Sequence, residues 1–199
     1  MNGAFEGAWA LHQFLQSRGV PYMIIGGIAV QHWGEPRFTR DLDLSVQVEV
    51  ASEVALIDEL LSTFDGRVED AAEFARKHRV LLLRVPGLTD ADLSFALPGY
   101  EEEALARVVP YDIGEGRFVH LCSAEDLIIY KSVAGRSQDM ADIEGILRRN
   151  LESLDLDYVR RWLHEFGVAL DMHEILDTFE KLCHTMEEDE VARRSNRLE

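Results

Sequence analysis

Residues 24–46 read IIGGIAVQHWGEPRFTRDLDLSV, and the prediction of the fold starts from this stretch. The apolar run at 22–25 predicts a buried strand, and the glycine pair Gly26-Gly27 directly after it predicts a turn. Thirteen residues then separate Gly27 from Asp41-Leu42-Asp43-Leu44, where charged and apolar side chains alternate. Because side chains of a strand alternate between two faces, this second run predicts a strand with Asp41 and Asp43 on one face and the leucines on the other.

The two aspartates on one strand face predict a cation site. Adjacent carboxylates repel each other and perturb each other's ionisation unless a cation lies between them. Mg²⁺ is a hard ion that prefers oxygen ligands, so it is the natural occupant. Taken alone, a glycine pair most often marks a tight turn, and an Asp-x-Asp sequence most often marks a solvated strand edge.

In this order and spacing, the glycine pair and Asp41-Leu42-Asp43 resemble the signature of the DNA polymerase beta-like nucleotidyltransferase superfamily. The resemblance implies an α/β (α+β) fold, with a small mixed, twisted β-sheet flanked by helices and a C-terminal helical region after it. It also implies that Gly26 and Gly27 open a helix beneath the nucleotide phosphates and that the two aspartates hold metal. Many members have Gly-Ser at the glycine pair, so in this chain backbone N–H groups would replace a hydroxyl as the phosphate contact.

The superfamily also requires a third carboxylate on a neighbouring strand. A hairpin is predicted for residues 79–97, with its second strand beside the Asp41 strand. Its parts are the apolar run RVLLLRV at 79–85, the turn signal Pro86-Gly87 and the alternating run TDADLSFAL at 89–97. Asp92 matches the third position, whereas Asp90, the alternative, is expected to lie in the turn. The resemblance implies two Mg²⁺ ions about 3.5–4 Å apart, bridged by Asp41 and Asp43. Asp92 would bind the first ion and help to take the proton from the acceptor hydroxyl.

Two arginines precede the acidic pair. Arg40 is adjacent to Asp41, and we predict that it contacts the phosphates of the nucleotide. For Arg37 a salt bridge to the aspartates is the favoured interpretation.

A second resemblance lies in SAEDLIIYKSVAGRSQDMADI at 123–143. This segment is similar to the C-terminal motif of the AbiEii-like branch of the superfamily, which includes nucleotidyltransferase toxins of bacterial toxin-antitoxin systems. The resemblance implies that Lys131, Arg136 and Asp142 belong to the nucleotide site, with Lys131 on the triphosphate as a catalytic residue. The alternative for Lys131 is a snorkelling side chain with its head in water. Asp139 and Asp142 either favour the N-terminus of the next helix electrostatically, or one of them orients Lys131.

Composition limits the partners. The chain has 20 Lys and Arg against 37 Asp and Glu, a net charge of −17, which argues against a broad basic face for nucleic acid. Two cysteines without close pairing suggest neither a disulfide framework nor structural zinc. Because no apolar run approaches membrane-spanning length and no signal peptide is evident, we predict a cytoplasmic protein without a membrane partner.

At 199 residues the chain is long enough for a catalytic domain with a small helical companion. The pattern becomes wholly helical near Leu121, so we predict a catalytic domain at 1–121 and a helical region at 122–199 that packs on it and completes the site. The predicted function is Mg²⁺-dependent transfer of a nucleoside monophosphate from an NTP to a hydroxyl of tRNA, a protein or a small molecule, with release of pyrophosphate. The toxin resemblance adds a cognate antitoxin to the partners, and the alternative function is a catalytically silent nucleotide- or partner-binding module with the same fold.

Overall fold

The computed structural model describes residues 3–39, 41–87, 89–96 and 99–196. The chain divides into two compact units, of which the first comprises Met1–Ala29 and Arg37–Ser123. The second comprises Val30–Pro36 and Ala124–Glu199, so the division also falls within one short helix.

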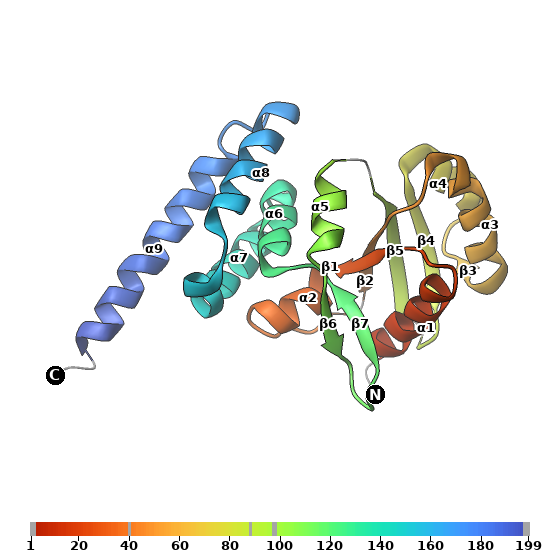
Figure 1. The fold of residues 1–199 in the computed structure, drawn as a ribbon, viewed down its shortest axis with the longest axis horizontal. Coiled ribbons are helices and arrows are strands. Elements are labelled where there is room, and N and C mark those ends of the chain that lie inside the picture. Colours follow the sequence, from red (N-terminus) through yellow and green to blue (C-terminus); the bar gives the residue numbers. More distant parts are fainter. Residues whose placement is uncertain (1–2, 40, 88, 97–98, 197–199) are drawn as a thin grey trace. The chain divides into compact units, whose positions relative to one another are not determined.

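In the described residues of the first unit, seven strands form one mixed sheet in the order β3-β4-β5-β2-β1-β7-β6 (Figure 1). Two strand pairs, β2 with β5 and β1 with β7, are parallel, and the other neighbours are antiparallel. The predicted α/β (α+β) class with a mixed sheet flanked by helices is therefore confirmed, as is the hairpin of β4 and β5 beside β2. The strand bounds are β1 Tyr22–Ile25, β2 Asp41–Val46, β3 Asp65–Gly66, β4 Val80–Val85, β5 Thr89–Phe95, β6 Val109–Asp112 and β7 Phe118–Leu121.

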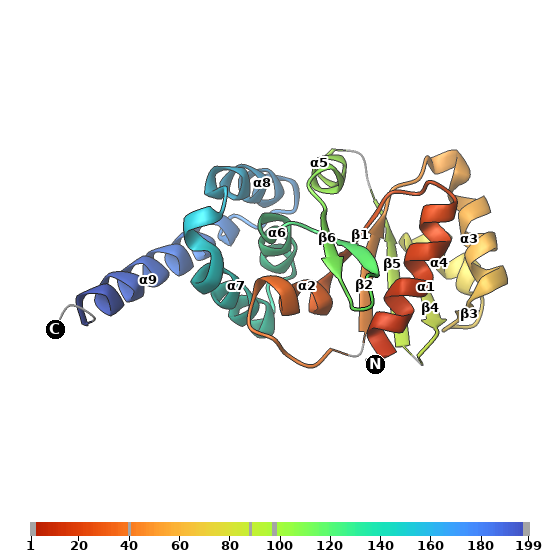
Figure 2. The ribbon, with the colours of Figure 1, turned by 60° about the horizontal axis from the view of Figure 1, so that its bottom comes forward.

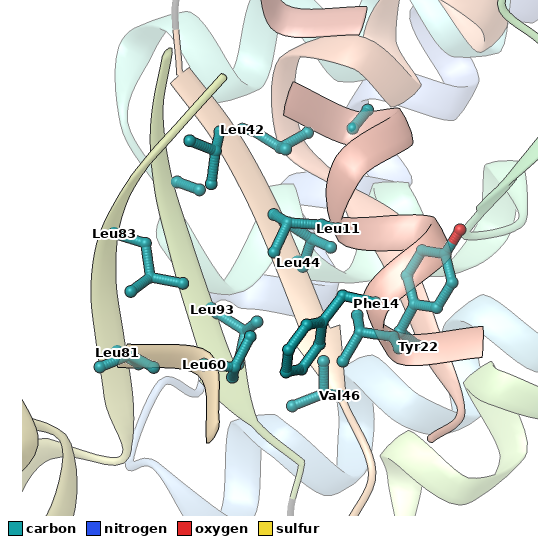
Figure 3. Close-up of a cluster of buried hydrophobic side chains, with 14 of the residues drawn as sticks. Leu11, Phe14, Tyr22, Leu42, Leu44, Val46, Leu60, Leu81, Leu83 and Leu93 are labelled. Atoms are coloured by element: carbon teal, nitrogen blue, oxygen red, sulfur yellow. The ribbon is translucent and has the colours of Figure 1, made fainter. Parts of the chain in front are cut away.

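One face of this sheet carries the hydrophobic core of the first unit. The helices α1 (Gly3–Ser17), α3 (Glu53–Thr63) and α4 (Ala71–His78) contribute buried side chains to it, and Figure 2 shows α1 running across the sheet. The alternation in β2 and β5 explains the arrangement, because Leu42, Leu44 and Val46 of β2 and Ala91, Leu93 and Phe95 of β5 are buried on this face. The core side chains labelled in Figure 3 are Leu11, Phe14, Tyr22, Leu42, Leu44, Val46, Leu60, Leu81, Leu83 and Leu93.

Two further helices begin in the first unit. The helix α2 (Gly26–Trp33) starts at the glycine pair, as predicted, and α5 (Tyr100–Ala106) follows β5. The side chain of Ser45 in β2 donates a hydrogen bond of 3.0 Å to Glu101 of α5. Ser45 alternates with the leucines of β2, so α5 is tied to the sheet face opposite the hydrophobic core.

The second unit is helical. Its four principal helices are α6 (Ala124–Ala134), α7 (Ser137–Asn150), α8 (Leu156–Ala169) and α9 (Ile175–Asn196). The segment at 30–36 is fixed to α7, because the Asn150 amide donates 2.7 Å to the Trp33 carbonyl and Arg149 donates to the Gly34 carbonyl. In the part of the chain that the structure describes, no helix has both the length and the apolar character needed to cross a membrane.

A cluster of rings joins α1 to β1 and β7 in the first unit. His12 Nδ1 lies 2.6 Å from the Tyr22 hydroxyl, and the His120 ring stacks on the Tyr22 ring with centroids 5.2 Å apart. Burial lowers the pKa of both His12 and His120, and the proximity of His120 lowers the pKa of His12 further. Burial also raises the pKa of Tyr22 to about 12. The native state therefore favours neutral imidazoles at this position.

We predict that the free energy of unfolding falls as pH is lowered from about 7.5 to about 5. A histidine whose pKa is lowered by folding binds protons more readily in the unfolded chain, so its contribution is complete above the unfolded pKa of about 6.5 and is lost below it. Urea denaturation across this range should show a smaller pH dependence in the double variant His12→Gln/His120→Gln. The exposed His164→Gln serves as control and should retain the wild-type dependence. An unchanged dependence in the double variant would contradict the prediction.

Candidate active site

The sheet face opposite the core of the first unit carries four carboxylates. Asp41 and Asp43 alternate with the buried leucines of β2, and Asp90 and Asp92 alternate with buried residues of β5. The two strands pair in parallel, with Asp41 opposite Asp90 and Asp43 opposite Asp92. Because directly opposed residues of neighbouring strands point to the same face, the four side chains form one acidic patch.

The prediction that Asp90 lies in a turn was wrong. The strand β5 begins at Thr89, so Asp90 is in the sheet, where Arg84 of β4 lies opposite. Arg84 Nη2 is 2.9 Å from an oxygen of Asp90. The turn is shorter than expected, because Thr89 already pairs with Val85 of β4. Asp92 nevertheless keeps the position predicted for the third carboxylate, because it is the β5 residue beside Asp43.

Gly26 lies directly against Asp43. The last residue of β1, Ile25, pairs with Asp43, and Gly26 then turns with φ of +69° into α2. A Cβ at this position would overlap the carboxylate of Asp43. Glycine is therefore required twice, for a left-handed backbone and for space beside the acid.

Gly27 is enclosed in a similar way by Thr39. A Cβ at Gly27 would lie only 2.6 Å from the Cβ of Thr39 and would overlap its hydroxyl oxygen. Thr39 is buried, and its hydroxyl donates 3.2 Å to the carbonyl of Asp41. This contact holds the start of β2 against the glycine pair. It also gives a physical reason for glycine at position 27, where many members of the superfamily have serine.

We predict that Gly27→Ser destabilises the protein by about 1–3 kcal/mol, because the new side chain overpacks a closed position. Thermal and urea denaturation would measure the loss. The double variant Gly27→Ser/Thr39→Gly removes the opposing Cβ and should recover part of it. Wild-type stability in Gly27→Ser would show that the loop yields freely and would contradict the prediction.

Asp92 is bound by an arginine that the sequence did not indicate. Arg67 Nη2 lies 2.7 Å from Asp92 Oδ1, and Arg67 Nη1 lies 3.4 Å from Asp90 Oδ2. Arg67 follows the two-residue strand β3, which is too short to give a periodic signal and was not predicted. No motif connects an arginine at this position with an aspartate 25 residues further along the chain.

The carboxylates fit Mg²⁺ in the chemistry of their donors, since all are hard oxygen ligands on one face. Among the described residues, however, no group of three His, Cys, Asp or Glu side chains is placed to hold a metal ion. One carboxylate of the expected three, that of Asp92, is directed to the Arg67 guanidinium. The assignment of Asp41, Asp43 and Asp92 as metal ligands stays a prediction.

In the second unit, Lys131 is buried between two carboxylates. Its Nζ lies 2.8 Å from Asp139 and 2.8 Å from Asp142, and 7% of its side chain is exposed. The snorkelling alternative was wrong, because the ammonium group is paired inside the helical unit. Of the two interpretations of Asp139 and Asp142, the structure supports orientation of Lys131, and both residues take part.

Arg136 completes this ion-pair cluster at the start of α7. Arg136 Nε lies 2.6 Å from Asp139, while most of the arginine side chain is exposed. Burial alone would raise the pKa of Asp139, but hydrogen bonds from Arg136 and Lys131 outweigh it and lower the pKa to about 2. Asp139 is therefore ionised at neutral pH and holds Lys131 as a charged pair.

The structure thus distributes the predicted site residues over both units. Those that lie together in the first unit are Gly26, Gly27, Asp41, Asp43 and Asp92, and those in the second unit are Lys131, Arg136 and Asp142. Arg40 was predicted to contact phosphate, and it lies outside the described residues. The phosphate-binding roles of the second group stay predictions.

We predict that Lys131→Met lowers the free energy of unfolding by about 3–5 kcal/mol, because it leaves Asp139 and Asp142 charged without their buried partner. Denaturation of the purified variant measures the effect. Lys181→Met removes an exposed lysine from the same unit and should change stability by less than about 0.5 kcal/mol. Adding Asp139→Asn and Asp142→Asn to Lys131→Met should restore part of the loss. Equal stability of the two single variants would exclude a structural role for the pair.

The mixed sheet with its flanking helices is the nucleotidyltransferase fold. An antigenic nucleotidyltransferase-like protein from Paracoccidioides brasiliensis has a TM-score of 0.53 and 21% identity, over 88% of this chain and 94% of that chain. The lincomycin-bound lincosamide antibiotic adenylyltransferase LnuA has a TM-score of 0.51 and 13% identity, over 73% of this chain and 98% of that chain. No protein-family model and no curated protein matches the sequence. At these identities the likeness shows the fold, and the AbiEii-like branch stays a prediction.

Proposed function

We propose that the protein is a nucleotidyltransferase that moves a nucleoside monophosphate from an NTP to an acceptor hydroxyl. The observation that carries the proposal is the register of β2 and β5, which places Asp43 beside Asp92 and Asp41 on the same face. In the reaction a bond forms between the acceptor oxygen and the α-phosphorus, the bond from the α-phosphorus to the bridging oxygen breaks, and pyrophosphate leaves. The hydroxyl proton passes to a base.

The chain's own residues can perform the separate tasks of this reaction. Asp41, Asp43 and Asp92 would hold two Mg²⁺ ions, which, when bound, stabilise the negative charge that develops on the phosphates. Asp92 is the carboxylate that we assign as proton acceptor. The backbone amides at the start of α2, opened by Gly26 and Gly27, would donate hydrogen bonds to phosphate oxygens. The resemblance adds Arg40, Lys131, Arg136 and Asp142 as nucleotide contacts.

We infer that a small-molecule hydroxyl is the acceptor to test first. LnuA, which shares the fold, is named as an antibiotic adenylyltransferase, and its structure contains lincomycin. The net charge of −17 argues against tRNA, because a polyanion would have to approach a strongly acidic protein. A protein hydroxyl and a cognate antitoxin are the other partners implied by the second resemblance.

A specific observation favours the alternative, a catalytically silent nucleotide- or partner-binding module. The carboxylate expected to act as base is occupied by Arg67. A silent protein would keep this pair permanently, whereas an enzyme would have to open it. Nucleotide binding is compatible with both, so only the formation of product distinguishes them.

We predict that Asp43→Asn lowers transfer by more than about a hundredfold, because loss of a direct metal ligand exceeds the 10–100-fold loss typical of outer-shell partners. The assay incubates each α-labelled NTP and Mg²⁺ with a panel of hydroxyl-bearing antibiotics, total tRNA or a cell lysate. Asp70→Asn changes an exposed aspartate of the same unit and is the matched control. Full activity of folded Asp43→Asn would refute the assignment, and no labelled product from wild type with any acceptor would favour the silent module.

A further inference from the structure

Arg67 is anchored beside the acidic patch by the sheet itself. Its backbone N–H donates 2.9 Å to the carbonyl of Leu82, one step beyond the residues that pair β3 with β4. Leu82 pairs with Asp92, and Asp92 pairs with Asp43. One row across neighbouring chain segments therefore contains Arg67, Leu82, Asp92 and Asp43. Only Leu82 separates Arg67 from Asp92 in this row, so the guanidinium can reach the Asp92 carboxylate.

The contact between Arg67 and Asp92 is partly sheltered from water. The Arg67 side chain is 23% exposed and the Asp92 side chain is 40% exposed, and the two nitrogen-to-oxygen contacts of Arg67 go to different aspartates. A charge-assisted hydrogen bond of 2.7 Å is stronger than one between neutral groups. Since arginine cannot lose its proton at neutral pH, the guanidinium is a permanent positive charge at this end of the acidic patch.

We propose that Arg67 is the internal counter-ion of Asp92 in the metal-free protein, and that divalent metal binding requires Asp92 to exchange Arg67 for the metal. This inference rests on the proposed function for the metal requirement. Asp92 cannot direct the same oxygen to both cations, and a guanidinium next to a divalent ion is repelled by it. Arg67 is thus a positioning residue that sets the metal affinity of the site.

Asp90 gives Arg67 a second partner during this exchange. Arg67 Nη1 already lies 3.4 Å from Asp90, so the guanidinium keeps a carboxylate when Asp92 turns away. This gives a role to Asp90, the fourth carboxylate of the patch, which the predicted three-carboxylate metal site does not require. Arg84 also binds Asp90, and its Nε and Nη2 both donate to the same oxygen of that residue, so it offers a matched comparison.

The exchange has two measurable consequences of opposite sign. Without the arginine charge, Asp92 is available to a metal ion, so divalent metal should bind more tightly. In the absence of metal, the acids lose a counter-ion, so the protein should be less stable. A purely structural salt bridge would produce only the second effect.

The test measures binding of Mn²⁺, without nucleotide, by the electron paramagnetic resonance signal of the free ion. We expect Arg67→Gln to bind Mn²⁺ about tenfold more tightly than wild type, which is the scale of one hydrogen bond to a charged group. Arg84→Gln should change the affinity by less than about twofold, because it leaves the Asp92 contact intact. Asp92→Asn added to Arg67→Gln should remove the gain. In thermal denaturation with chelator, Arg67→Gln should melt below wild type, and Mn²⁺ should reduce the difference.

Equal or weaker Mn²⁺ binding by Arg67→Gln would overturn the inference, as would an equal gain in Arg84→Gln. No Mn²⁺ binding by either wild type or Arg67→Gln would overturn it as well. The proposed function is judged separately, because labelled transfer that depends on Asp43 would support it whatever the metal titration shows. Tighter metal binding by Arg67→Gln, with no transfer by wild type, would support the exchange and count against the enzyme.

Discussion

The parallel pairing of β2 with β5 is the constraint on which the rest of the site depends. Buried residues at every second position, most of them apolar, commit one face of both strands to the core, so the register cannot slip by one residue without burying carboxylates. The same register puts Asp43 beside Asp92 and Asp41 beside Asp90. Burial of apolar side chains on one face therefore forces like charges together on the other, and the fold stabilises an arrangement that the acids alone would oppose.

Such an arrangement needs positive charge, and the chain supplies part of it locally. Arg84 faces Asp90 across the β4–β5 pair, and Arg67 reaches Asp92 from the end of β3. The helical unit uses the same principle for a different result, because Lys131 sits buried between Asp139 and Asp142. There the ion pair is closed from solvent, whereas the arginines beside β5 remain accessible to exchange. The degree of burial thus distinguishes the structural ion pairs of Lys131 from the more exposed ion pairs of Arg67 and Arg84, which we propose can change partners.

The sequence was sufficient to predict secondary structure where the pattern of residues is local and periodic. Alternation predicted β2 and β5, and the glycine pair predicted the start of α2, because each depends on residues close together in the chain. Arg67 could not be predicted, since its relation to Asp92 arises only from the register of β3, β4 and β5. Asp90 was misplaced because the composition after Pro86-Gly87 does not show at which residue the pairing with β4 resumes. The partners of Lys131 were left open because Lys131 lies in α6 and Asp139 and Asp142 lie in α7, so their contact depends on how the two helices pack.

The contact between Asp92 and Arg67 has a mechanistic consequence. Asp92 is held by charge, and a charge accepts any suitable cation in the same place. Because 40% of the Asp92 side chain is exposed, a carboxylate held by this ion pair turns when a better partner arrives. The acid that can move is therefore Asp92. The proposed chemistry requires the same residue to change partner, because a base that is bound to arginine has to be released before it can receive a proton.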